Sequence, residues 1–134
     1  MVSSHIEATI RCDAAAVWDA VTAVGRYSWR SDLSRTEILN ETQFVEYTLK
    51  GYATTFTITA AEPYKRWELA IENRSMKGRW VGIFTPKGQE TQIDFTETVT
   101  LKPPQKFFFR PFIQPYLKKQ QARFVSDLKK ALQP

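Results

Sequence analysis

The chain has 134 residues, of which 43% are hydrophobic and 25% charged, and its formal net charge is +5 at pH 7. This is the composition of a folded globular protein, and it argues against a disordered or collagen-like chain. The length suits one domain over residues 1–134, which can bury roughly two-thirds of its unfolded surface without metal or disulfide support.

The sequence offers no internal disulfide, no signal peptide and no membrane-spanning segment. The only cysteine, Cys12, cannot form an internal disulfide, which fits a reducing cytoplasm. No basic start followed by an apolar run marks a signal peptide, and no apolar stretch approaches the ~20 residues that span a bilayer. We therefore expect a soluble, cytoplasmic protein.

The positive charge is concentrated in the C-terminal third of the chain. From Lys102 onward there are eight Lys or Arg residues and one acid, whereas the first 101 residues carry a small excess of acids. Such asymmetry can indicate an anionic partner. The simpler interpretation is one helix with a solvated, lysine-rich face.

The N-terminal region predicts a strand followed by short helices. Apolar and polar residues alternate over His5–Cys12, as in a half-buried strand. Asp13 is placed as the N-cap of a helix that ends near Gly25. The stretch Arg26–Asp32 then predicts a second short helix or a turn.

After this region the hydrophobic period becomes two, with turn residues between the segments. Short gaps between consecutive strands favour an antiparallel meander. The predicted strands are Ser34–Asn40, Gln43–Lys50, Ala53–Glu62, Arg66–Arg74, Gly78–Pro86 and Thr91–Leu101.

A long helix closes the chain after Pro103 and Pro104. It begins either at Pro115, whose missing N–H costs nothing in a first turn, or near Lys106 with kinks at the prolines. The whole order predicts an α+β fold, in which six to seven antiparallel strands curve around the C-terminal helix.

Several segments, in this order and spacing, carry a family resemblance: Ile6–Ile10 with Asp13–Val21, Trp29, Glu62–Trp67, Phe84–Thr91 and Phe124–Leu132. The chain resembles the START-like helix-grip superfamily (SRPBCC), which includes birch-pollen allergens, lipid-transfer domains and bacterial polyketide cyclase or dehydrase-like proteins. It is most similar to the small cyclase-like branch. The resemblance implies the helix-grip fold with a ligand cavity between sheet and helix, but members range from carriers to enzymes.

The sequence shows no convincing catalytic set, and we predict no catalytic residue, metal or cofactor. The only histidine, His5, falls on the polar side of the first strand, and Cys12 falls on the apolar side. One His and one Cys cannot form the usual zinc site, and none of the five glycines form a phosphate-binding loop. A cyclase or dehydratase that needs a single acid or base is still compatible with the sequence.

Apolar residues on one face of the predicted sheet supply both a core and the wall of a cavity that a single helix cannot fill. The predicted ligand-binding residues, taken from this face, the loop after the first helix and the last helix, are Trp29, Tyr52, Phe56, Ile58, Trp67, Leu69, Trp80, Phe84, Phe95, Glu97, Val99, Phe108, Leu117 and Phe124.

Glu97 is the exceptional member of this set, because it falls on the same face as Phe95 and Val99. A carboxylate there is costly unless it is paired, and burial should raise its pKa. Its expected partners are Tyr47, Tyr52 or a polar group of the ligand. Alternatively, a β-bulge turns Glu97 outward, or a lysine pairs with it in solvent.

The favoured function is binding of a small hydrophobic or aromatic molecule, lipid or polyketide-like, in the internal cavity. The alternatives are a cyclase or dehydratase that uses one cavity carboxylate, and an interaction module that acts through the basic C-terminal third. In the second case Phe107–Phe112 contacts an anionic membrane rather than covering the cavity mouth. No nucleic acid is expected, since no aromatic stacking platform is evident. The basic residues expected at a membrane surface are Lys106, Arg110, Lys118 and Lys119.

Overall fold

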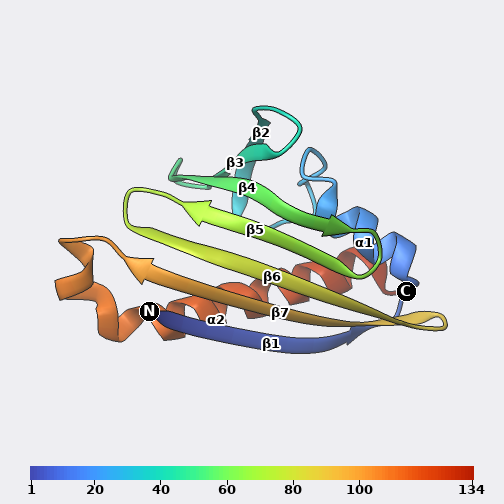
Figure 1. Ribbon diagram of the computed structural model, residues 1–134. Coiled ribbons are helices and arrows are strands. Elements are labelled where there is room, and N and C mark those ends of the chain that lie inside the picture. Colours follow the sequence, from blue (N-terminus) through green and yellow to red (C-terminus); the bar gives the residue numbers. More distant parts are fainter.

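The computed structural model describes residues 1–134 as one seven-stranded antiparallel sheet and two helices. The strands lie in the order β1-β7-β6-β5-β4-β3-β2, and the sheet curves over α2 (Figure 1). The predicted α+β helix-grip architecture is confirmed. The elements are β1 (Val2–Ile10), α1 (Ala14–Thr22), β2 (Leu33–Ile38), β3 (Gln43–Thr48), β4 (Ala53–Glu62), β5 (Arg66–Glu72), β6 (Met76–Lys87), β7 (Glu90–Leu101) and α2 (Gln105–Leu132).

One short helix, not two, follows β1. Asp13 caps α1 as predicted, because its carboxylate accepts a hydrogen bond of 2.9 Å from the backbone N–H of Ala16. The helix ends at Thr22, before Gly25. Residues 26–32 form turns and bends instead of a second helix. Their backbone is engaged elsewhere, since the N–H of Ser31 donates to a carboxylate of α2.

The alternation of apolar and polar residues places the strands and their faces correctly, while the strand ends differ by a few residues. The largest difference is at β1, which begins at Val2 because this residue pairs with Val99 of β7. The register between β6 and β7 is continuous from Met76 opposite Leu101 to Lys87 opposite Glu90. Every inward position of β7 therefore keeps its orientation along the whole strand.

The last helix starts at Gln105, so the predicted start at Pro115 is wrong and the alternative start near Lys106 is correct within one residue. Pro111 and Pro115 both lie inside α2. Each proline lacks the N–H that would bond the preceding turn. In Figure 1 the first turns of α2 run in a different direction from the rest of the helix.

Two clusters of buried residues hold α2 against the sheet. The larger joins α1, the sheet and the C-terminal half of α2, where Val125 and Leu128 are buried. The smaller joins Val99 and Leu101 of β7 to Ile113 and Leu117 of α2. No helix combines the length and hydrophobicity that a membrane span requires.

Between these clusters a buried glutamine ties α2 to two strands. The side-chain amide of Gln121 donates to the carbonyl oxygens of Ser4 (3.0 Å) and Phe95 (3.3 Å). Its carbonyl accepts from the Ser4 hydroxyl at 2.7 Å. All the polar atoms of this buried side chain are thus used, and the position of α2 across the sheet is fixed.

Candidate ligand-binding cavity

A cavity of about 190 Å³ lies between the inner face of the sheet, the end of α1, residues 23–32 and α2. This volume far exceeds the roughly 10–15 Å³ that one water molecule needs. Of the 29 residues in its wall, 18 are hydrophobic. A mainly apolar wall with a few polar groups is the usual construction of a small-molecule site.

Nine of the predicted residues form part of this wall, and they come from the loop after α1, four strands and α2. Most of the aromatic rings among them contact one another in a chain. Trp67 and Trp80 meet edge to face with 5.9 Å between centroids, and Phe95 and Phe124 meet edge to face at 5.7 Å. Trp80 and Phe95 join these pairs in a tilted contact at 4.8 Å. The nine are Trp29, Phe56, Trp67, Leu69, Trp80, Phe95, Glu97, Leu117 and Phe124.

The other five predicted residues lie outside the cavity wall. Phe84 is 2% exposed in the larger cluster and Val99 is 1% exposed in the smaller one, so both are core residues. Ile58 packs beside the larger cluster. The Tyr52 hydroxyl shares a hydrogen bond of 2.7 Å with that of Ser75. Phe108 is 68% exposed and does not cover the cavity.

Sequence reasoning missed a charged group at the cavity. Arg30 donates two hydrogen bonds of 3.0 Å to Asp32 and bonds of 3.2 and 3.4 Å to Glu46. Its guanidinium also lies 4.7 Å from the ring centre of Phe124. The inward position of Glu46 follows from alternation with Phe44 in the same strand, whereas nothing in the local sequence indicates where Arg30 lies.

The same loop is fastened to α2 by polar contacts beside the cavity. The buried carboxylate of Asp127 accepts from the Ser31 backbone N–H and hydroxyl, both at 2.7 Å. Arg123 donates to the Ser31 hydroxyl and carbonyl oxygens, both at 2.8 Å. These contacts hold Trp29, which packs edge to face on Phe124 at 5.2 Å, in the wall.

Glu97 points into the cavity from the middle of β7, directly opposite Trp80 of β6. Its carboxyl has no hydrogen-bond or ion-pair partner in the protein. Neither expected tyrosine reaches it, because Tyr47 donates to Glu37 and Tyr52 pairs with Ser75. Burial, and secondly the negative charge of Glu46, raise the pKa of Glu97 to about 7. The two outward alternatives, a bulge and a solvent-exposed lysine pair, are wrong.

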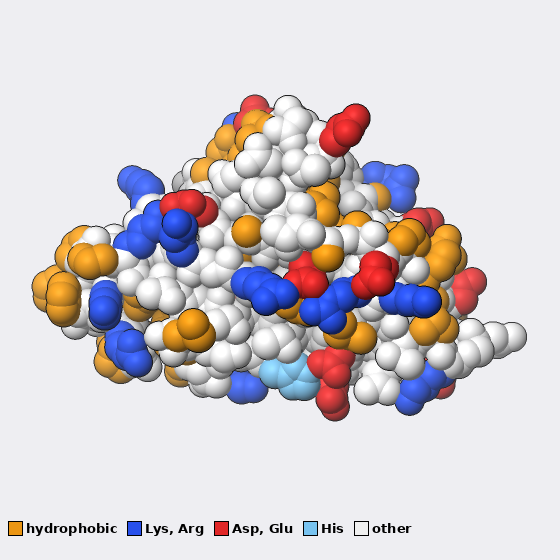
Figure 2. Space-filling view, viewed as in Figure 1, with side chains coloured by type: hydrophobic (Ala, Val, Ile, Leu, Met, Phe, Trp, Pro, Cys, Tyr) orange, Lys and Arg blue, Asp and Glu red, His pale blue; other side chains and the backbone are white.

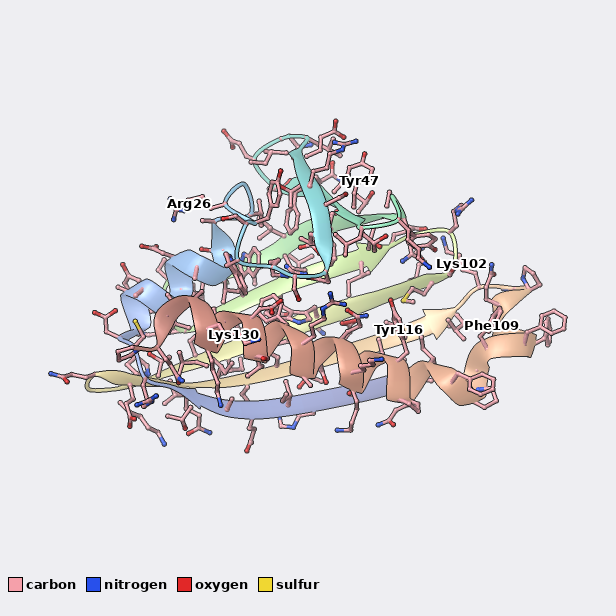
Figure 3. The ribbon with its side chains drawn as sticks, turned by 180° about the vertical axis from the view of Figure 1, so that it is seen from behind. Arg26, Tyr47, Lys102, Phe109, Tyr116 and Lys130 are labelled. Atoms are coloured by element: carbon pink, nitrogen blue, oxygen red, sulfur yellow. The ribbon has the colours of Figure 1, made fainter.

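Tyr116 is another titratable group in the wall, and sequence reasoning did not place it there. It lies on α2 at the rim, about half exposed, and extends toward the sheet in Figure 3. Partial burial, and then the negative charge of Glu97, raise the pKa of the Tyr116 hydroxyl above its ordinary value. The hydroxyl therefore stays protonated at neutral pH and can donate a hydrogen bond.

A glycine makes room for the aromatic wall. A Cβ atom built on Gly82 would lie 2.6 Å from the Trp80 ring and 3.2 Å from the Phe95 ring. Both distances are shorter than ordinary carbon contacts. Gly82 therefore lets Trp80 fold back along the strand and meet Phe95 beside Glu97.

One group with metal-ligand chemistry lies away from the cavity. His5 is exposed, as expected, and bonds the carboxylate of Asp94, with Glu7 beside them. All three belong to the outward register of β1 and β7. Cys12 is unpaired and packs against the larger cluster.

A curved antiparallel sheet that holds one long helix over an apolar cavity defines a START-like helix-grip protein. The profile of the family described as polyketide cyclase / dehydrase and lipid transport matches residues 1–133, and the chain belongs to this family. No curated protein sequence matches the chain.

Solved structures agree with this assignment at the level of the fold. A conserved protein from Geobacillus kaustophilus has a TM-score of 0.83 and 13% identity, over 97% of this chain and 94% of that one. A START superfamily protein from Mycobacterium smegmatis has a TM-score of 0.80 and 12% identity, over 97% and 96%. The di-domain ARO/CYC BexL from the BE-7585A biosynthetic pathway has a TM-score of 0.77 and 9% identity, over 100% of this chain and 48% of that one.

Proposed function

We propose that the chain binds one small, mainly apolar or aromatic molecule, such as a lipid or a polyketide, in the cavity between the sheet and α2. The observation that carries this proposal is the 190 Å³ cavity with its aromatic-rich wall, which is built by residues from six strands, the loop after α1 and both helices. The lipid and polyketide chemistry in the family description is consistent with such a ligand. The unpaired thiol of Cys12 suits action in a reducing compartment such as the cytoplasm.

A neutral hydrophobic probe should bind at one saturable site, and the variant Thr54→Phe should weaken its binding at least tenfold. Thr54 lines the cavity, so a phenylalanine ring there occupies ligand space. Thr55 is the next residue of β4 and faces the other side, so Thr55→Phe is the matched control. Titration with N-phenyl-1-naphthylamine, followed by fluorescence, measures both variants.

Two results would reject the cavity as a binding site: no saturable binding to the unchanged chain, or equal binding by the two phenylalanine variants. Thermal unfolding of each variant shows whether a loss of binding comes from loss of the fold. Native mass spectrometry of gently purified protein, which retains a co-purifying molecule, identifies the ligand class directly.

Catalysis by a single cavity carboxylate is the alternative within the same site. A group with a pKa of about 7, such as Glu97, suits proton transfer at neutral pH. The other carboxylates of the wall, Asp32 and Glu46, are already paired with Arg30. Beside Glu97 the cavity offers only two tyrosines, Tyr27 and Tyr116, for acid–base chemistry, so binding is the better-supported function.

A second function is favoured by the exposed aromatic cluster at the start of α2, made of Phe107, Phe108, Phe109 and Phe112. Their exposed fractions are 74%, 68%, 55% and 66%, and none of them lines the cavity. Lys106 and Arg110 lie among them. Figure 2 shows hydrophobic and basic side chains together at this end of the molecule. Figure 3 shows Phe109 at the N-terminal end of α2. We propose that this end docks on an anionic membrane surface, with Lys118 and Lys119 adding to the attraction.

Vesicles that contain about a third phosphatidylserine should sediment the chain at low salt, and the double variant Phe108→Ala/Phe112→Ala should stay in the supernatant. Leu49→Ala is the matched control, because Leu49 is 65% exposed on a different part of the surface. Moderate salt should weaken binding, since charges attract the chain to the vesicle. Failure of the unchanged chain to sediment at low salt would exclude the membrane surface as a partner.

A further inference from the structure

The charges around the cavity do not balance on the side that faces Glu97. Three carboxylates, those of Asp32, Glu46 and Glu97, line the wall with two guanidinium groups. Arg30 is bonded to both Asp32 and Glu46, so its donors are engaged by the protein. Arg26 is exposed at the rim. The inner part of the cavity therefore has a negative potential, and Glu97 is the one carboxylate of the three that has no partner.

Aromatic rings surround this unpaired carboxyl. Trp80 lies directly across the strand pair from Glu97, and Phe95 precedes Glu97 by two residues on the same face. Trp67 extends the wall on the next strand, edge to face with Trp80. Aromatic faces attract cations, and the attraction increases when water is excluded. A carboxylate surrounded by several aromatic rings is an arrangement that can recognise an organic ammonium group.

We propose that the ligand of this cavity carries a basic amine on an aromatic or aliphatic body, and that its ammonium group pairs with Glu97 beside Trp80 and Phe95. This inference rests on the proposed ligand-binding function and specifies its chemistry. The ammonium supplies the partner that a carboxylate in an apolar wall requires. The body of the ligand contacts the remaining apolar wall.

The same charges disfavour other amphipathic ligands. The carboxylate of a fatty acid placed near Glu97 would meet Glu97 and Glu46, and no free cation inside the cavity could compensate for them. A neutral alcohol or ketone could share a hydrogen bond with Glu97 but would gain nothing from its negative charge. Affinity should therefore fall in the order amine, neutral analogue, acid.

Binding of the amine should depend on pH through Glu97. The charged or titratable groups that line the cavity with Glu97 are Glu46 on β3, Tyr27, Arg30 and Asp32 in the loop after α1, and Tyr116 on α2, with Arg26 at the rim. Of these, Glu97 titrates near neutrality. The amine requires the ionised carboxylate, so its affinity should rise by about 30-fold between pH 5.5 and pH 8, while the amine itself stays protonated.

Three matched probes test the proposal by isothermal titration calorimetry: 2-(1-naphthyl)ethylamine, 2-(1-naphthyl)ethanol and 1-naphthylacetic acid. At pH 8 the amine should bind at least tenfold more tightly than the alcohol, and the acid should bind most weakly. In Glu97→Gln the advantage of the amine over the alcohol should disappear. Glu90→Gln, at an exposed hairpin position, is the matched control and should keep that advantage.

The outcomes separate this inference from the function on which it rests. If the alcohol binds as tightly as the amine, or if Glu97→Gln keeps the preference for the amine, the assignment of an amine is wrong and the cavity remains a binding site. If none of the three probes binds and N-phenyl-1-naphthylamine also fails, both proposals are wrong. An amine preference that increases with pH and requires Glu97 supports the inference.

Discussion

Between pH 4 and pH 8, the variant Glu97→Gln should gain about 3 kcal/mol of folding stability relative to the unchanged chain. The folded state raises the pKa of Glu97 from 4.5 to about 7, so it holds this proton more tightly than the unfolded state does. As the pH rises through this window, the unfolded state ionises Glu97 first and the folded state loses stability. Glutamine does not titrate, so the variant escapes this loss.

Urea unfolding of both chains at pH 4, 6 and 8 measures the difference. The two free energies of unfolding should change in parallel below about pH 4.5 and above about pH 7, and should diverge between these values. Parallel profiles over the whole range would mean that Glu97 is solvated in the folded chain. The cavity would then lack the negative centre on which recognition of an amine depends.

Phe84→Ala should destabilise the chain by about 3–5 kcal/mol, and Trp80→Ala by less, although tryptophan is the larger residue. Phe84 is 2% exposed and packs between Trp18 and Phe95, at centroid distances of 5.1 and 5.9 Å. Its removal opens a void in the core. The ring of Trp80 already borders the cavity, so its removal mainly enlarges an existing space.

Urea unfolding and probe titration together distinguish these two roles. Phe84→Ala should lower the free energy of unfolding, whereas Trp80→Ala should weaken binding of N-phenyl-1-naphthylamine more than it lowers stability. If Trp80→Ala costs as much stability as Phe84→Ala and leaves the affinity for the probe unchanged, Trp80 is a core residue and does not border the ligand cavity.

The sheet could be predicted from the sequence because alternation with period two determines which side chains face inward. Phe95, Glu97 and Val99 follow this rule along β7, and the unbroken pairing with β6 keeps all three on the inner face. The inward carboxyl of Glu97, the central feature of the cavity, was therefore visible in the sequence. The same alternation would have revealed Glu46, two residues after Phe44.

Other parts of the site depend on contacts between distant segments, which a local pattern does not encode. Arg30 belongs to the cavity because residues 26–32 bond α2 through Ser31 and Asp127, far apart in the sequence. The alternation along the strands also does not distinguish inward residues that belong to the core from inward residues that line the cavity. Phe84 and Val99 are core because α1 and the first half of α2 cover them.

An open sheet has two outermost strands, and uncovered strand edges promote aggregation by pairing between chains. Here α2 lies along β1, where Lys118 donates to the carbonyl of His5 at 3.3 Å and Gln121 to that of Ser4. At the other edge, β2 is six residues long and irregular in register between Leu33 and Arg35. The helix that encloses the cavity thus also protects one sheet edge, and a short, irregular strand makes the other a poor template for a second copy.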